Sequence, residues 1–163
     1  MATDASVSDA RDQLDLVLRF FSRVDAKLST VLAINTGMLG ALGAMVPPIQ
    51  TASWPMAIAP VLTVILLGFS YIFLYRGGFP VTKGGYASLI YFKNIAERNE
   101  ASFITAYTNL NTDELRSDLL AQVWRNSEIL SAKFNCLRSA FVAMALGVLP
   151  WMVSLCVFAL HKK

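Results

Sequence analysis

Residues 28–46 read LSTVLAINTGMLGALGAMV, and this run decides the fold class. It is 19 residues long and contains no Asp, Glu, Lys or Arg. At a rise of about 1.5 Å per residue, such a helix reaches roughly 28 Å, close to the hydrocarbon thickness of a bilayer. The run therefore predicts a membrane-spanning helix.

Two further runs have the same character, residues 56–75 and residues 139–160, which also lack charged side chains. The whole chain is 55% hydrophobic and only 15% charged, whereas soluble domains carry nearer a quarter charged residues. A helical hairpin buried in a soluble bundle is the alternative, but charge-free runs this long are uncommon there. We expect an all-α integral membrane protein with three transmembrane helices.

The distribution of Lys and Arg predicts the orientation and the division of the chain. Residues 1–27 carry four of these cations, residues 76–138 carry eight, the loop between the first two spans carries none, and the tail carries two. The positive-inside rule then places the N-terminus and the central region in the cytoplasm. We divide the chain into a cytoplasmic amphipathic helix at 1–27, a transmembrane hairpin at 28–75, a cytoplasmic helical module at 76–138, and a third span with a short tail at 139–163.

Two long helices are expected to run from the cytoplasmic region into the bilayer. The first extends from about Ser8, a candidate N-cap, to Met45, because its apolar seam is spaced every three or four residues. The second begins after Asn111, which forms a capping box with Glu114, and continues for about 49 residues. The two apolar stripes consist of Leu14, Val17, Phe21, Val24, Leu28 and Val31 in the first helix, and of Leu115, Leu119, Val123, Ser127, Leu130, Phe134, Leu137 and Phe141 in the second. Residues 86–96 and 102–110 are predicted to form short helices or turns between them.

Few residues in the chain suit catalysis. The only histidine, His161, follows the third span, and no Cys/His cluster suits a metal ion. The spans contain no acidic or basic residue that would serve an ion-coupled transporter. We therefore expect neither an enzyme nor a bound cofactor. The net charge of +3 fits membrane orientation and not a nucleic-acid polymer, because no dense basic-aromatic patch is present.

Two stretches of the central region are candidates for ligand binding. Residues 77–85, GGFPVTKGG, place Lys83 between glycines, where it could hold a single phosphodiester or only face lipid headgroups. Residues 88–98, SLIYFKNIAER, offer rings for base stacking, an amide for a base edge, and cations for a phosphate. The residues concerned are Tyr91, Phe92, Lys93, Asn94 and Arg98. Alternatively, the aromatic residues here are core residues that fix a short helix to the bundle.

The order of these segments resembles the membrane-spanning effector of Pycsar antiphage systems. The resemblance is carried by RVDAKLSTVLAINTGMLGAL at 23–42, SLIYFKNIAER at 88–98 and DLLAQVWRNSEILSAKFNCLRSAF at 118–141. It implies an effector in the bacterial inner membrane that senses cUMP or cCMP from a partner cyclase, damages the membrane and aborts infection. The chain has no β-roll of the usual cyclic-nucleotide-binding type, so the helical module has to sense the nucleotide, either within one protomer or between protomers of a homo-oligomer. A holin-like or structural membrane protein without a ligand is the alternative.

Two further groups of residues are relevant to such an effector. A charged collar at the membrane boundary is predicted from Arg23, Asp25, Lys27, Lys133 and Arg138, although ordinary snorkelling of these side chains is the alternative. In the first span, the small residues allow close approach of another helix, and Asn35 is expected to hydrogen-bond across to one. The glycines of this surface are Gly37, Gly40 and Gly43. The partner helix belongs either to the same protomer or to another.

Overall fold

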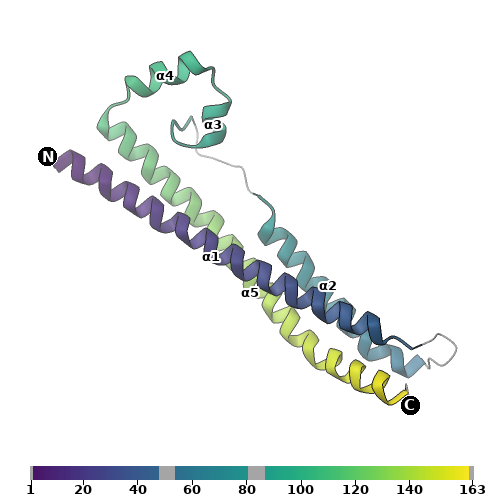
Figure 1. The fold of residues 1–163 in the computed structure, drawn as a ribbon. Helices are drawn as coiled ribbons and strands as arrows, with labels where there is room; N and C mark the ends of the chain where they lie inside the picture. Colours follow the sequence, from purple (N-terminus) through teal and green to yellow (C-terminus); the bar gives the residue numbers. More distant parts are fainter. Residues whose placement is uncertain (1, 48–53, 81–86, 162–163) are drawn as a thin grey trace. The chain divides into compact units, whose positions relative to one another are not determined.

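The computed structural model describes residues 2–47, 54–80 and 87–161, and its elements in these ranges are helices (Figure 1). Helix α1 spans Ala2–Met45 and α2 spans Ile58–Gly78, preceded by the short 3₁₀ helix η2 at Trp54–Ala57. The helices α3 (Phe92–Ala96) and α4 (Glu100–Thr108) are short, and α5 spans Thr112–His161. The expected all-α fold with three long helices is confirmed.

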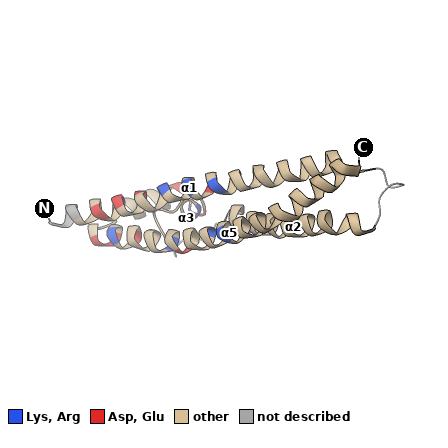
Figure 2. Cartoon of the chain, turned by 90° about the horizontal axis from the view of Figure 1, so that it is seen from below, with Lys and Arg blue, Asp and Glu red and all other residues tan. Residues whose placement is uncertain are grey.

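Three helices are long and apolar enough to cross a membrane: Ser6–Met45, Trp54–Gly78 and Thr112–His161. Figure 2 shows Lys, Arg, Asp and Glu along the N-terminal parts of α1 and α5, while the rest of both helices is free of them. Each of these two helices therefore continues as one helix from a polar stretch into an apolar stretch. Together with the apolar α2, they make the chain a membrane protein.

The chain divides into two compact units, which are described separately. The polar unit consists of Met1–Arg23 and Pro80–Ala132, and the apolar unit consists of Val24–Phe79 and Lys133–Lys163. Helices α1 and α5 contribute residues to both units, whereas α3 and α4 belong to the polar unit and α2 to the apolar unit.

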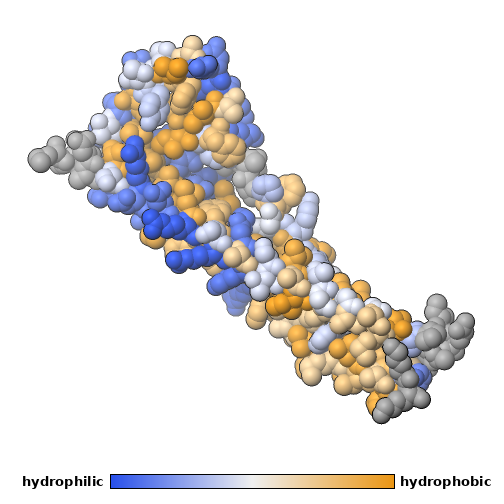
Figure 3. Space-filling model, viewed as in Figure 1, coloured by the Kyte–Doolittle hydropathy of each residue, from blue (hydrophilic) through white to orange (hydrophobic). Residues whose placement is uncertain are grey.

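In the apolar unit, the three long helices pack around a small core. It contains Leu28, Val31, Met38, Leu67, Leu74, Ala140 and Met144. Much of the remaining apolar surface is exposed, as in Val61, Ile65 and Leu146, and Figure 3 shows hydrophobic residues covering most of the visible face of this unit. An exposed apolar surface on charge-free helices is suited to contact with lipid.

In the polar unit, α1 packs through Ala10 and Val17, and α5 through Leu119. The Arg116 guanidinium donates a hydrogen bond of 3.0 Å to the hydroxyl of Ser6. At the start of α5, the predicted capping box is present. The Glu114 amide donates to Asn111 Oδ1 at 2.8 Å, and the Asn111 amide donates to Glu114 Oε2 at 3.2 Å.

One predicted helix start is wrong. Helix α1 begins at Ala2, so Ser8 lies inside the helix and does not cap it. The predicted short helices or turns are present as a turn at residues 88–91 followed by α3, and as α4, which begins two residues earlier than predicted.

The predicted seam of α1 is buried or half-buried throughout, but in α5 the predicted Ser127, Phe134 and Phe141 are exposed. The predicted stripe of α5 advances mostly in steps of four residues. Because this step exceeds the helical repeat of 3.6, the stripe drifts away from the buried face. That face of α5 instead uses the smaller residues Ala140, Ala143 and Gly147.

Candidate functional site

The turn before α3 is fixed by Asp118 of α5. The carboxylate Oδ2 accepts hydrogen bonds from the Ser88 hydroxyl at 3.0 Å and from the Leu89 amide at 2.9 Å. The Ser88 hydroxyl oxygen in turn accepts from the amides of Ile90 at 3.1 Å and Tyr91 at 3.0 Å. Ser88 is only 3% exposed, so the network is shielded from water. It sets where α3 starts and how its first residues are presented.

A second contact closes this segment at its other end. The Arg98 guanidinium donates to the carbonyl oxygen of Ala87 at 3.1 Å. Ala87 has φ 57°, a left-handed conformation that costs a non-glycine residue on the order of 1 kcal/mol. Arg98 was predicted to bind a phosphate. In the structure one of its amino groups holds the backbone of the segment, and binding of a phosphate by Arg98 stays a prediction.

The aromatic residues of the segment differ in exposure. The rings of Tyr91 and Phe92 have centroids 4.8 Å apart, and Phe92 is 66% exposed. The interpretation of Phe92 as a core residue is therefore wrong. On α4, the rings of Phe103 and Tyr107 lie 5.7 Å apart, with Tyr107 also exposed. Exposed rings of this kind can stack on a nucleobase.

The other predicted ligand residues lie on the same short segment. Lys93 is exposed and Asn94 is half-buried, both within α3. Neither side chain forms a hydrogen bond or ion pair within the described ranges 2–47, 54–80 and 87–161. Their polar groups are therefore available to a ligand. Lys83 lies outside the described residues.

A buried amide was not singled out as a site residue by sequence reasoning. Gln122 of α5 is 3% exposed, and its Nε2 donor has no hydrogen-bond partner in the part of the chain that the structure describes. It lies one helical turn after Asp118. The burial of Gln122 could not be predicted, because a single Gln in a helix of polar character is ordinarily a surface residue.

The residues of the predicted charged collar differ in the contacts that they make. Lys133 Nζ lies 2.7 Å from Asp25 Oδ1, so these two members of the predicted collar form an ion pair. The Arg23 guanidinium lies over the Phe20 ring, 5.1 Å from its centroid. Lys27 and Arg138 are exposed and form no ion pair within the described ranges.

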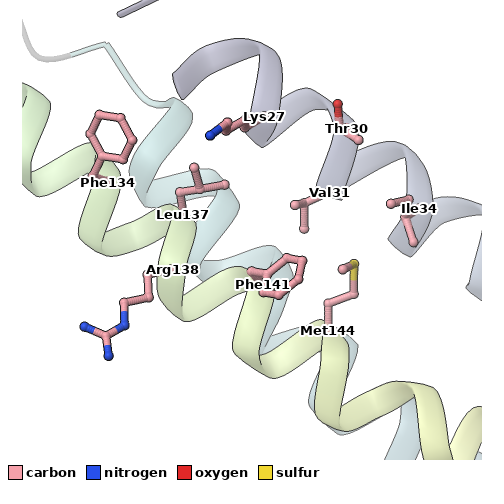
Figure 4. A pocket seen from close by; sticks show the side chains of 9 residues that line it. All are labelled: Lys27, Thr30, Val31, Ile34, Phe134, Leu137, Arg138, Phe141 and Met144. Atoms are coloured by element: carbon pink, nitrogen blue, oxygen red, sulfur yellow. The ribbon is translucent and has the colours of Figure 1, made fainter. Parts of the chain in front are cut away.

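Lys27 and Arg138 instead lie beside an apolar groove between α1 and α5 in the apolar unit (Figure 4). Its volume is about 450 Å³. Apart from the two cations and Thr30, its walls are apolar, formed by Val31, Ile34, Phe134, Leu137, Phe141 and Met144.

Asn35 forms the cross-helix hydrogen bond expected of it. Its Nδ2 donates to the Ser70 hydroxyl at 2.8 Å, and Ser70 donates to the Ala140 carbonyl oxygen at 2.8 Å. Asn35 and Ser70 are fully buried. One polar chain therefore connects α1, α2 and α5. The Oδ1 atom of Asn35 has no partner among the described residues.

The glycines of α1 lie in open space with respect to the residues that the structure describes. A Cβ added at Gly37, Gly40 or Gly43 would meet nothing within 4 Å among the described residues. Packing of these glycines against another helix, of the same protomer or of another, stays a prediction. Close approach is found at two other glycines. A Cβ at Gly77 would lie 3.0 Å from Cys136 Cβ, and one at Gly147 would lie 3.4 Å from Leu67 Cδ2.

Among the described residues, no group of three or more His, Cys, Asp or Glu side chains is arranged to hold a metal ion.

Comparison with known proteins identifies one match. The sequence model of a family described as the Pycsar effector protein domain matches residues 9–160, nearly the whole chain. No curated protein and no solved structure matches the chain.

Proposed function

The chain belongs to the Pycsar effector family of antiphage defence, and on that premise we propose that it senses cUMP or cCMP made by a partner cyclase. On binding the nucleotide it impairs the integrity of the bacterial inner membrane, and the cell dies before phage mature. The membership supports an effector that responds to a cyclic-nucleotide signal. The choice of a pyrimidine and the membrane damage are our proposal.

The observation that carries this proposal is the continuity of α1 and α5. Each is one helix with a polar stretch and a stretch long and apolar enough to cross a membrane. A ligand that changes how the polar stretches pack therefore acts on the same helices that span the bilayer. The ligand can shift the arrangement only by binding one arrangement more tightly than the other.

We propose that the segment from Ala87 to Arg98 takes part in nucleotide binding. The exposed ring of Phe92 would stack on the base, with Tyr91 supporting it at 4.8 Å between centroids. Lys93 would hold the phosphate, and Asn94 would hydrogen-bond the base edge. Asp118 and Arg98 keep the segment in place. Lys83 is retained as a second candidate cation on sequence grounds.

The membrane topology is also part of the proposal. Residues 1–27 and 76–138 would lie in the cytoplasm, because they hold twelve of the fourteen Lys and Arg residues. The hairpin at 28–75 and the third span at 139–163 would lie in the inner membrane, where several copies of the chain associate.

A holin-like protein without a ligand is the alternative, and toxicity in cells distinguishes the two. The chain is expressed with a cyclase that makes cUMP or cCMP, or with a catalytically inactive form of that cyclase. We expect loss of membrane potential only with the active cyclase. Equal toxicity with the inactive cyclase would support the holin-like alternative.

The same assay tests the binding segment. Phe92→Ala is expected to abolish the cyclase-dependent loss of membrane potential. Trp124→Ala is the matched control, because it also removes an exposed aromatic ring from the polar unit. Full activity of Phe92→Ala would remove this ring from the binding site.

A further inference from the structure

The apolar unit has an unbalanced charge at one end of its helices. Asp25 is the only acidic residue in this unit, and its carboxylate is paired with Lys133 at 2.7 Å. Lys27 follows Asp25 by two positions in α1, and Arg138 follows Lys133 by five in α5. Within the described ranges, neither Lys27 nor Arg138 has an ion-pair partner. Among the residues that the structure describes, these two cations at the edge of an apolar surface are therefore left without an anionic partner.

The space next to these cations is apolar. Figure 4 shows Val31, Ile34, Phe141 and Met144 facing the space between α1 and α5. Lys27 lies at the end of the groove nearest Phe134 and Leu137, and Arg138 extends outward from α5 beside Leu137. The groove thus has two parts. Its apolar channel runs along the membrane-spanning stretches of α1 and α5, and its cationic end lies where the charge-free runs begin.

We propose that this groove binds one anionic phospholipid. An acyl chain lies along Val31, Ile34 and Phe141, and the phosphate lies at the cationic end, where the exposed side chains of Lys27 and Arg138 turn to bind it. Phosphate accepts charge-assisted hydrogen bonds from both kinds of cation, and lipid chains suit the apolar walls. The charge complementarity specifies an anionic lipid over a zwitterionic one.

A soluble phosphate compound fits this place less well. It would satisfy the cations and leave the apolar groove open, while an uncharged apolar molecule would fill the groove and leave both cations unpaired. A phospholipid satisfies both parts, and it is the molecule that surrounds helices of this kind. The proposal does not depend on nucleotide sensing.

Native mass spectrometry of the full-length chain tests the proposal. The protein is released from nanodiscs containing equal amounts of dioleoyl phosphatidylglycerol and dioleoyl phosphatidylcholine, without nucleotide. We expect one phosphatidylglycerol molecule to be retained per chain in preference to phosphatidylcholine. Glycerol 3-phosphate added to the nanodiscs is expected not to displace it. Equal retention of the two lipids, or displacement by glycerol 3-phosphate, would overturn the proposal.

Two variants locate the lipid. The double substitution Lys27→Gln and Arg138→Gln is expected to weaken phosphatidylglycerol retention about 30-fold, from two lost cation contacts near a membrane surface. Arg76→Gln is the matched control, because Arg76 lies in the last turn of α2 and does not line the groove between α1 and α5.

Ile34→Trp keeps both cations and fills the groove, and it is also expected to lose the lipid. Wild-type retention by the double variant or by Ile34→Trp would contradict the assignment of the lipid to this groove. Thermal unfolding of each variant in detergent checks that the fold is retained.

Discussion

At the scale of single residues, a few polar side chains determine how the apolar helices pair with one another. Apolar side chains in a bilayer gain little from leaving lipid for one another, so they specify helix pairing weakly. Asn35 and Ser70 add a directional contact, because their hydrogen bonds reach the Ala140 carbonyl on a third helix. In the polar unit, Asp118 does the same for the turn at Ser88.

Ser70→Ala tests the three-helix contact. The substitution removes the acceptor of Asn35 and the donor to Ala140, and we expect the free energy of unfolding to fall by about 1 kcal/mol. Thermal unfolding followed by circular dichroism in detergent measures the change. Ser22→Ala is the control, because the Ser22 hydroxyl is exposed and bonds only to Arg19 of its own helix. Equal unfolding temperatures for both variants would contradict the structural role of Ser70.

Asp118→Ala tests the anchoring of the candidate binding segment. Loss of the carboxylate leaves the Leu89 amide without its acceptor, so exchange of backbone amides across residues 88–92 should accelerate about tenfold. Hydrogen–deuterium exchange with mass spectrometry measures this rate. Glu128→Ala removes an exposed carboxylate of the same helix, paired with Arg125, and should leave the exchange unchanged. Unchanged exchange in Asp118→Ala would show that other contacts fix the segment.

At the scale of helices, glycines have two different environments. Gly77 lies against Cys136 and Leu28, so a side chain there must displace atoms close to another helix backbone. Gly40 faces open space in this chain. The same residue type therefore serves packing inside the protomer at one place and leaves a smooth surface at the other.

Substitution by isoleucine separates these environments. Gly77→Ile is expected to lower the free energy of unfolding by about 1–3 kcal/mol, because it overpacks the contact with Cys136. Gly40→Ile is expected to leave the stability of the monomer nearly unchanged and to abolish cyclase-dependent killing, since the proposed contact between copies is blocked. Chemical cross-linking in membranes measures association. Gly40→Ile with normal killing and normal cross-linking would contradict a protomer interface on this face.

The sequence predicted the long helices well and their contacts less well. Charge-free runs, the capping box at Asn111 and the seam of α1 are local patterns, and each indicated its element correctly. The buried face of α5 was misplaced, because small residues such as Ala140 and Gly147 pack there while the larger Phe141 is exposed. The anchoring of the turn at Ser88 could not be predicted, since Asp118 lies thirty residues away. Which glycines form contacts also depends on tertiary packing, not on their spacing.

At the scale of the whole molecule, the account rests on helices that contain both polar and membrane-spanning stretches. Family membership makes the chain an effector of antiphage defence. We propose that the nucleotide acts on the polar stretches of α1 and α5 and that several copies then breach the bilayer. Small, exposed residues on α1 and an anionic lipid at Lys27 would both influence how these copies associate.

The measurement that tests this account most directly is dye leakage from liposomes containing the purified full-length protein. The liposomes contain phosphatidylethanolamine and phosphatidylglycerol, and they are titrated separately with cUMP, cCMP, cAMP and cGMP. We predict that cUMP or cCMP causes leakage, that the two purine nucleotides do not, and that Phe92→Ala prevents it. Leakage that is the same with all four nucleotides as without any would contradict direct gating of this chain by a cyclic pyrimidine nucleotide.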